Sequence, residues 1–126
     1  MDETVRRVLV VDDEPSIRLL CRVNLPFSGF EVVEAADGPS ALEEVRERPV
    51  DLVLLDVMMP GMGGFDVAER LQSDPATASV PIVFLSARAD RADVRRGLSL
   101  GAAEYITKPF DPLRLGERLR RIVDKS

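Results

Sequence analysis

Short apolar segments alternate with longer amphipathic segments along the whole chain. The apolar runs are rich in β-branched residues and lie near residues 8–11, 31–35, 51–55, 80–85 and 104–107. Each run is followed by a segment with apolar positions at helical spacing, near residues 15–27, 39–47, 64–73, 90–99 and 112–123. The repeated strand–helix alternation predicts an α/β fold, in which a doubly wound parallel sheet carries helices on both faces.

The polarity of the strands predicts their places in the sheet. The runs at 8–11, 52–55 and 82–85 are almost continuously apolar, as expected of strands covered on both faces. The run at 31–35 contains two glutamates and fits a position nearer the edge. Pro26 is expected to shorten the first helix, because proline removes an intrahelical hydrogen bond.

Length and composition fit a single domain spanning residues 1–126. Hydrophobic residues make up 45% of the chain and charged residues 31%, which is enough apolar material for a packed core. No apolar run approaches the roughly 18–20 residues that a membrane helix needs. The acidic N-terminus lacks the apolar region of a signal peptide. We therefore expect a cytoplasmic protein without a membrane segment.

The cysteine and histidine content excludes several kinds of chemistry. The one cysteine, Cys21, rules out an internal disulfide and is expected to be a small buried residue. The chain has no histidine, which excludes Ser-His-Asp catalysis and histidine-ligated metals. It also excludes a histidine phosphodonor within this chain.

The net charge of −5 is unevenly distributed. Residues 1–85 carry a net charge of −9, whereas residues 86–126 carry +4. The basic excess lies mainly on the last two predicted helices. Such asymmetry can mark a binding surface, and the sequence leaves open whether these arginines face solvent, a second subunit or an acidic partner.

Charged side chains directly follow three of the predicted strands. Asp12 and Asp13 follow the first strand, Asp56 follows the third and Lys108 follows the fifth. Because the carboxyl ends of parallel strands meet at one edge of the sheet, these side chains should converge there. Carboxylates at close range raise one another's pKa or bind a metal. An all-oxygen ligand set without His or Cys favours Mg²⁺.

Three side chains in this predicted site have the chemistry of phosphoryl transfer. Asp56 ends the most apolar strand, and a carboxylate in that central place can act as a nucleophile toward phosphorus. Ser86 ends the fourth strand, where its hydroxyl can donate a hydrogen bond to a phosphoryl oxygen. Lys108 supplies the positive charge that such a group needs.

Four motifs in chain order resemble the receiver domain of response regulators, in particular the stand-alone chemotaxis type. They are Val11–Pro15, Asp56–Gly64, Phe84–Ala87 and Gly101–Phe110, and the resemblance covers nearly all 126 residues. It implies a (βα)5, flavodoxin-like fold with five parallel strands in the order 2-1-3-4-5.

The resemblance also implies roles for the residues of the acidic site. Asp56 would be the phosphoacceptor. Mg²⁺ would be bound by Asp13, Asp56 and the backbone carbonyl of Met58, with Asp12 acting mainly through water. Lys108 would bind the phosphoryl oxygens.

Further implications concern the peptide bond that aims Lys108 into the pocket and the switch that responds to phosphorylation. The peptide bond between Lys108 and Pro109 is expected to be cis. Ser86 would sense the phosphoryl group, and Tyr105 would turn inward as Ser86 moves. The two residues would then change the surface formed by the last two helices and the last strand.

Together these implications describe a signalling switch of a two-component system and not an enzyme. The phosphoryl group would come from a sensor histidine kinase or a histidine phosphotransfer protein. The output would be a downstream protein target, with a phosphorylation-dependent dimer left open and no direct binding of nucleic acid expected. Because the chain carries no attached output domain, it would act through protein partners or be part of a longer regulator.

Met58 and Arg88 depart from the pattern of the family. They stand two residues after Asp56 and Ser86. In the family that the chain resembles, these two positions help set how fast the aspartyl phosphate hydrolyses. Met58 offers no hydrogen bond to an attacking water, and Arg88 could shield or pair with the phosphoryl group. We therefore expect a phosphorylated state that lasts longer than a fast chemotaxis signal.

Two alternatives use the same fold. A flavodoxin-like module that binds FMN needs a phosphate-binding loop after the first strand, where Asp12, Asp13 and Glu14 would repel a phosphate. A small Mg²⁺-dependent aspartyl-phosphate hydrolase should carry a second acid two residues after its nucleophile, where Met58 stands.

Overall fold

The computed structural model describes residues 5–88 and 90–125 and has the predicted α/β architecture. Five parallel strands form one sheet in the order β2-β1-β3-β4-β5, which confirms the predicted strand order. The strands are β1 (Arg6–Val11), β2 (Phe30–Ala35), β3 (Leu52–Asp56), β4 (Ile82–Ser86) and β5 (Glu104–Thr107). The helices are α1 (Pro15–Asn24), α2 (Gly38–Glu47), α3 (Gly64–Ser73), α4 (Arg91–Ser99) and α5 (Pro112–Lys125).

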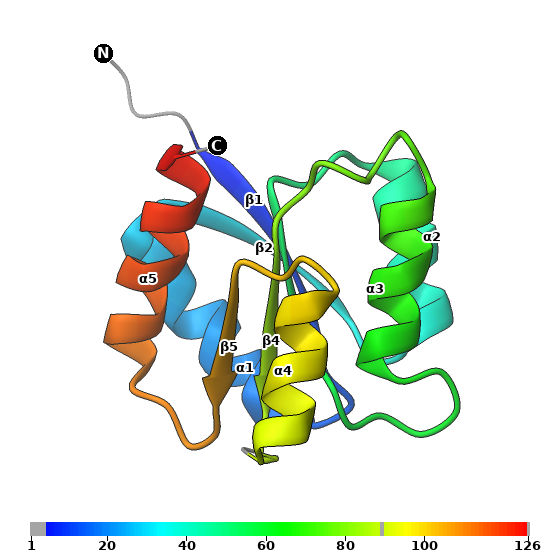
Figure 1. Cartoon of the computed structure of the whole chain (residues 1–126). Coiled ribbons are helices and arrows are strands. Elements are labelled where there is room, and N and C mark those ends of the chain that lie inside the picture. Colours follow the sequence, from blue (N-terminus) through cyan, green and yellow to red (C-terminus); the bar gives the residue numbers. More distant parts are fainter. Residues whose placement is uncertain (1–4, 89, 126) are drawn as a thin grey trace.

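Helices cover both faces of the sheet. Figure 1 shows α1 and α5 on one face and α2, α3 and α4 on the other. None of the helices in the described part of the chain is long and apolar enough to cross a lipid bilayer.

Two apolar cores result from the alternation of side chains along the central strands. Leu9, Val53 and Phe84 point toward α2 and α3, where they pack with Phe65. On the opposite face, the other residues of the same strands pack against α1 and α5, and this core includes Val10, Leu54, Leu85, Cys21 and Leu119. Cys21 is 1% exposed, so it is the small buried residue that the sequence predicts.

The edge position of β2 confirms the prediction from its polarity. Its outer residues include Glu31, which forms an ion pair with Arg7 of β1 at 3.2 Å. Strand β1 begins at Arg6, two residues earlier than its apolar run, because its polar first residues still pair with β2. The sheet is therefore longer at this edge than the apolar pattern indicates.

Proline positions explain two helix boundaries. α1 ends at Asn24 and continues as a 3₁₀ turn, η1 (Leu25–Ser28), so Pro26 shortens the helix as predicted. α5 begins at Pro112, where the missing N–H costs no hydrogen bond, and the carboxylate of Asp111 accepts a hydrogen bond from the N–H of Leu113 at 3.0 Å. This start fixes the place of α5 relative to β5 and Lys108.

Candidate functional site

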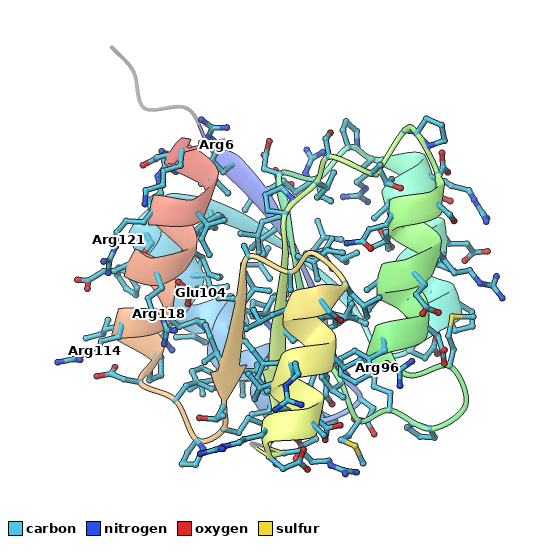
Figure 2. All side chains as sticks on the ribbon, viewed as in Figure 1. Arg6, Arg96, Glu104, Arg114, Arg118 and Arg121 are labelled. Carbon is cyan, nitrogen blue, oxygen red and sulfur yellow. The ribbon has the colours of Figure 1, made fainter. Side chains whose placement is uncertain are left out.

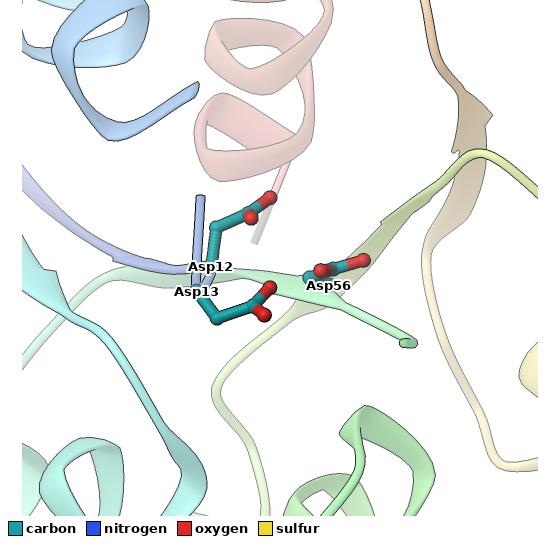
Figure 3. A group of neighbouring side chains, drawn as sticks. All are labelled: Asp12, Asp13 and Asp56. Carbon is teal, nitrogen blue, oxygen red and sulfur yellow. The ribbon is translucent and has the colours of Figure 1, made fainter. Parts of the chain in front are cut away.

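Three carboxylates and one ammonium group meet at the carboxyl edge of the sheet. One oxygen each from Asp12, Asp13 and Asp56 lies within 4.8 Å of the others. Figure 3 shows the three side chains next to one another. Asp12 and Asp56 are buried, with 1% and 3% of their surface exposed, and Asp13 is exposed. The site is thus closed on the side of the sheet and open on the side of Asp13.

Two contacts position Asp56. β3 is the central strand, and all five of its residues are buried. The N–H of Met58 donates a hydrogen bond to Oδ1 of Asp56 at 3.2 Å. Helix α3 begins so close to the strand end that a Cβ atom on Gly64 would lie 2.2 Å from the carbonyl oxygen of Asp56. Only glycine allows this approach.

Burial, and after it the neighbouring carboxylate of Asp12, raises the pKa of Asp56. Lys108 and the hydrogen bond from Met58 lower it, and the net result is a pKa of about 7. Burial and a second carboxylate nearby both destabilise the charged form of Asp56 unless a positive charge balances it. The site therefore favours a cation.

Lys108 comes from the loop after β5 and reaches into this site. Its Nζ lies 3.0 Å from Oδ2 of Asp12, 2.8 Å from Oε1 of Glu14 and 3.7 Å from Oδ1 of Asp56. The Lys108–Pro109 peptide bond is cis, as expected, and the N–H of Lys108 donates a hydrogen bond to the carbonyl oxygen of Ser86 at 2.8 Å. Burial alone would lower the pKa of Lys108, but its contacts with Glu14 and Asp12 raise it, so the ammonium group stays charged.

The donor set of this edge fits Mg²⁺. It is made of carboxylate oxygens, which this hard cation prefers, and the described residues offer no histidine or thiolate at the site. Three acidic groups and one lysine leave a net negative charge for the cation to balance. The exposed carboxylate of Asp13 leaves a path to solvent.

Ser86 is fully buried at the end of β4. Its hydroxyl oxygen accepts a hydrogen bond from the N–H of Arg88 at 3.0 Å. It does not cap a helix, because α4 is capped by Asp90, whose carboxylate accepts a hydrogen bond from the N–H of Asp93 at 2.9 Å. The hydroxyl is therefore bound to the loop that joins β4 to α4.

Tyr105 lies half-buried on β5 beneath α4. Its hydroxyl donates a hydrogen bond to the carbonyl oxygen of Arg88 at 2.7 Å. Its ring centre is 6.2 Å from that of Phe84, and a Cβ atom on Gly97 of α4 would lie 3.0 Å from the Tyr105 ring. The ring is thus held between the sheet and the helix.

Met58 and Arg88 lie side by side at the open rim of the site. Nη1 of Arg88 is 3.7 Å from the sulfur of Met58, whose side chain is half-exposed. The guanidinium also forms ion pairs with Asp93 at 2.8 Å and Asp90 at 3.6 Å. Arg88 therefore already has acidic partners on α4 and its cap, which the sequence did not reveal.

Sequence reasoning also missed the contact of Glu14 with Lys108. Glu14 directly follows Asp12 and Asp13 at the end of β1. That position was a usable signal, since any acid there lies at the same sheet edge. What the sequence could not show is that the two side chains reach each other.

Comparisons with known proteins agree with this geometry. The family described as "Response regulator receiver domain" matches residues 8–120. The DNA-binding response regulator MtrA of Mycolicibacterium smegmatis is 47% identical over 120 residues, which are 95% of this chain and 51% of that protein. The phosphate regulon transcriptional regulatory protein PhoB of Pseudomonas aeruginosa is 39% identical over 121 residues, 96% of this chain and 53% of that protein.

Solved structures show the same fold. The chemotaxis protein CheY4 of Vibrio cholerae superposes with a TM-score of 0.88 at 33% identity and covers 94% of this chain and 99% of its own. The chain spans about half the length of the two curated relatives named above. The family match, the strand order and the acidic pocket of Asp12, Asp13 and Asp56 with Lys108 lead to one conclusion. This chain belongs to the family of response regulator receiver domains, the phosphoacceptor switches of two-component signalling systems.

Proposed function

We propose that Asp56 accepts a phosphoryl group from the histidine of a sensor kinase or a histidine phosphotransfer protein. The observation that carries this proposal is the convergence of Asp12, Asp13 and Asp56 within 4.8 Å, with Nζ of Lys108 3.7 Å from the carboxylate of Asp56. Such an arrangement offers a nucleophile, a cation site and a positive charge for the transferred group. Phosphoryl transfer needs little more than this positioning and charge stabilisation.

The proposed transfer is a simple displacement at phosphorus. An oxygen of the Asp56 carboxylate attacks the phosphorus, the P–N bond of the donor phosphohistidine breaks, and the imidazole leaves with the bonding electrons. The donor histidine must lie outside residues 1–126, since these contain no histidine. Lys108 holds the phosphoryl oxygens, and Ser86 turns its hydroxyl toward them.

Asp12, Asp13, Asp56 and the backbone carbonyl of Met58 would hold Mg²⁺, with Asp12 acting mainly through water. When bound, the cation supplies positive charge that keeps Asp56 ionised and neutralises the incoming phosphoryl oxygens. This chain's own contribution is the burial of Asp56 and the fixed place of Lys108. The same residues would allow slow hydrolysis of the aspartyl phosphate and no turnover of other substrates.

The signal would leave the site through Ser86 and Tyr105. Movement of the Ser86 hydroxyl toward the phosphoryl group releases the N–H of Arg88, whose carbonyl holds the Tyr105 hydroxyl. Tyr105 packs against α4, so its contacts couple the site to the surface of α4, β5 and α5. That surface would bind a downstream protein or a second phosphorylated copy and would not bind nucleic acid directly.

The arginines of α5 support a binding role for that surface. Figure 2 shows Arg114, Arg118 and Arg121 along one side of α5, with Glu104 of β5 beside them. Arg118 donates to Glu104 at 2.9 Å through Nε, whereas no ion pair within the described residues uses Arg114 or Arg121. These two arginines are therefore available to an acidic partner or to a twin subunit.

We further propose that residues 1–126 form one receiver domain that works in the cytoplasm. The family match covers residues 8–120 and supports the first part. The cytoplasm is where a kinase with access to ATP would load the donor histidine. The hydrolase and FMN alternatives gain no support, because Met58 replaces the second acid and Glu14 extends the acidic cluster after β1.

Incubation with acetyl phosphate tests the proposal without knowledge of the kinase. With Mg²⁺ present, intact-protein mass spectrometry should show the addition of one phosphoryl group to the wild type. Asp56→Asn should stay unmodified, and so should the wild type in excess chelator. Equal modification of wild type and Asp56→Asn would refute the assignment of Asp56.

A further inference from the structure

The acidic partner closest to Lys108 is neither the phosphoacceptor nor a residue of the predicted metal site. Oε1 of Glu14 lies 2.8 Å from Nζ, closer than Asp12 at 3.0 Å and Asp56 at 3.7 Å. The lysine side chain is only 12% exposed, whereas that of Glu14 is 56% exposed. Glu14 therefore covers the ammonium group from the solvent side.

The local structure leaves the Glu14 carboxylate free for this contact. Glu14 is the N-cap residue of α1, but its side chain makes no capping hydrogen bond. Its backbone N–H donates to Oδ1 of Asp12 at 2.9 Å, which fixes the residue at the rim of the site. Among the described residues, Lys108 is the partner of the Glu14 carboxylate, in both a hydrogen bond and an ion pair.

We propose that Glu14 is a resting-state counter-ion that competes with the incoming phosphoryl group for Lys108. This inference rests on the proposed phosphorylation of Asp56. A phosphoryl group on Asp56 brings further negative charge next to the carboxylates of Asp12 and Asp13 and the ammonium group of Lys108. Glu14 adds another negative charge beside that ammonium group, so it favours the unphosphorylated state.

The matched variants separate the contact from a general change in charge. Glu14→Gln keeps the shape of the side chain and removes its charge, and no helix cap is lost. Glu14→Asp keeps the charge but shortens the side chain, which should break the contact with Nζ. Glu43→Gln removes the same charge from an exposed site on α2 and serves as the control.

The first measurement follows phosphorylation by acetyl phosphate at saturating Mg²⁺. Mass spectrometry should show that Glu14→Gln is phosphorylated about two- to fivefold faster than wild type, since exposed ion pairs contribute modestly. The phosphorylation rate of Glu14→Asp should lie between those of wild type and Glu14→Gln, and the rate of Glu43→Gln should match that of wild type. A Glu14→Gln rate equal to or below that of Glu43→Gln would overturn the proposal.

A second measurement tests the ion pair in the absence of phosphorylation. Lys108 and Lys125 are the only lysines in the chain, so Lys125 provides an internal reference for acetylation by acetic anhydride. In Glu14→Gln, the ratio of Lys108 to Lys125 acetylation should rise, because the lysine loses a partner that shields it and raises its pKa. An unchanged ratio would show that Glu14 does not hold Lys108. If the ratio rises while wild type resists acetyl phosphate, the contact stands, but the proposed function and the competition that depends on it both fail.

Discussion

The hydroxyl of Tyr105 donates a hydrogen bond to the carbonyl oxygen of Arg88 at 2.7 Å. The N–H of the same Arg88 donates to the hydroxyl of Ser86 at 3.0 Å. One residue of the β4–α4 loop thus binds both of the side chains that we assign to the switch. A displacement of Ser86 toward a phosphoryl group would change the position of this loop and, with it, the anchor of Tyr105.

Replacement of Gly97 by alanine should displace Tyr105. The added Cβ atom would lie 3.0 Å from carbon atoms of both Tyr105 and Phe84, which is tighter than most packed side-chain contacts, so the rings must shift by a few tenths of an ångström. We expect a loss of about 1–3 kcal/mol in the free energy of unfolding. We also expect stronger acrylamide quenching of Tyr105, which is the only tyrosine in a chain without tryptophan. Ser99→Ala, on an exposed site of the same helix, is the control, and equal quenching of both variants would argue against this packing.

The stability of the metal-free protein should depend on the ionisation of Asp56. Its pKa is raised from 3.8 to about 7 in the folded state, chiefly by burial. The folded state therefore holds this proton more tightly than the unfolded chain. As a result, the free energy of unfolding that Asp56 contributes should fall as the pH rises from about 4 to about 7 and stay constant above.

Urea denaturation of Asp56→Asn and wild type in chelator measures this effect. The stability of the variant relative to wild type should increase by about 2–4 kcal/mol between pH 4 and pH 8. Glu43→Gln, at an exposed site, should follow the wild-type curve. If the difference in free energy of unfolding between Asp56→Asn and wild type were the same at all pH values, Asp56 would not carry a raised pKa.

Met58→Asn should shorten the life of the phosphorylated state. The methionine sulfur contacts Arg88 and offers no strong hydrogen bond to water, whereas an amide does. One added hydrogen bond of about 1 kcal/mol in the transition state predicts hydrolysis roughly fivefold faster. The rate is measured by intact-protein mass spectrometry after removal of acetyl phosphate. Leu98→Asn, whose parent side chain is 49% exposed compared with 50% for Met58, should keep the wild-type rate. A slower or unchanged rate in Met58→Asn would contradict the idea.

If α5 forms the interface of a phosphorylation-dependent dimer, charge reversal on α5 should abolish the self-association of the protein. Arg114→Glu and Arg121→Glu are preferred to a change at Arg118, because Arg118 already pairs with Glu104 within the chain. Sedimentation analysis with acetyl phosphate and Mg²⁺ should show dimers of wild type and monomers of the double variant, with equal phosphorylation of both. Arg46→Glu on α2 is the control. A wild type that stays monomeric when phosphorylated would exclude the dimer and leave a different protein as the partner.

The sequence predicts the site more completely than it predicts the contacts around it. Asp12, Asp56 and Lys108 each follow an apolar run directly, and the carboxyl ends of parallel strands must meet at one edge. By contrast, Glu14 and Lys108 are 94 residues apart, and their contact depends on how α1 and the loop after β5 pack. No local pattern carries that information.

Helix packing accounts for the other contacts that the sequence could not reveal. The need for glycine at position 97 follows from the distance between α4 and the rings of Phe84 and Tyr105. The partners of Arg88 likewise depend on where α4 starts, since Asp93 lies in its first turn. These distances are tertiary properties, whereas the strand ends are fixed by local hydrophobic patterning.

The most direct test of the central claim is to identify the residue that carries the phosphoryl group. After reaction with acetyl phosphate and Mg²⁺, borohydride reduction converts an aspartyl phosphate to homoserine, which peptide mass spectrometry locates. We predict homoserine at position 56 in the wild type and none in Asp56→Asn or in chelator. Homoserine at position 12 or 13, or no homoserine although the intact protein gains a phosphoryl group, would contradict the account.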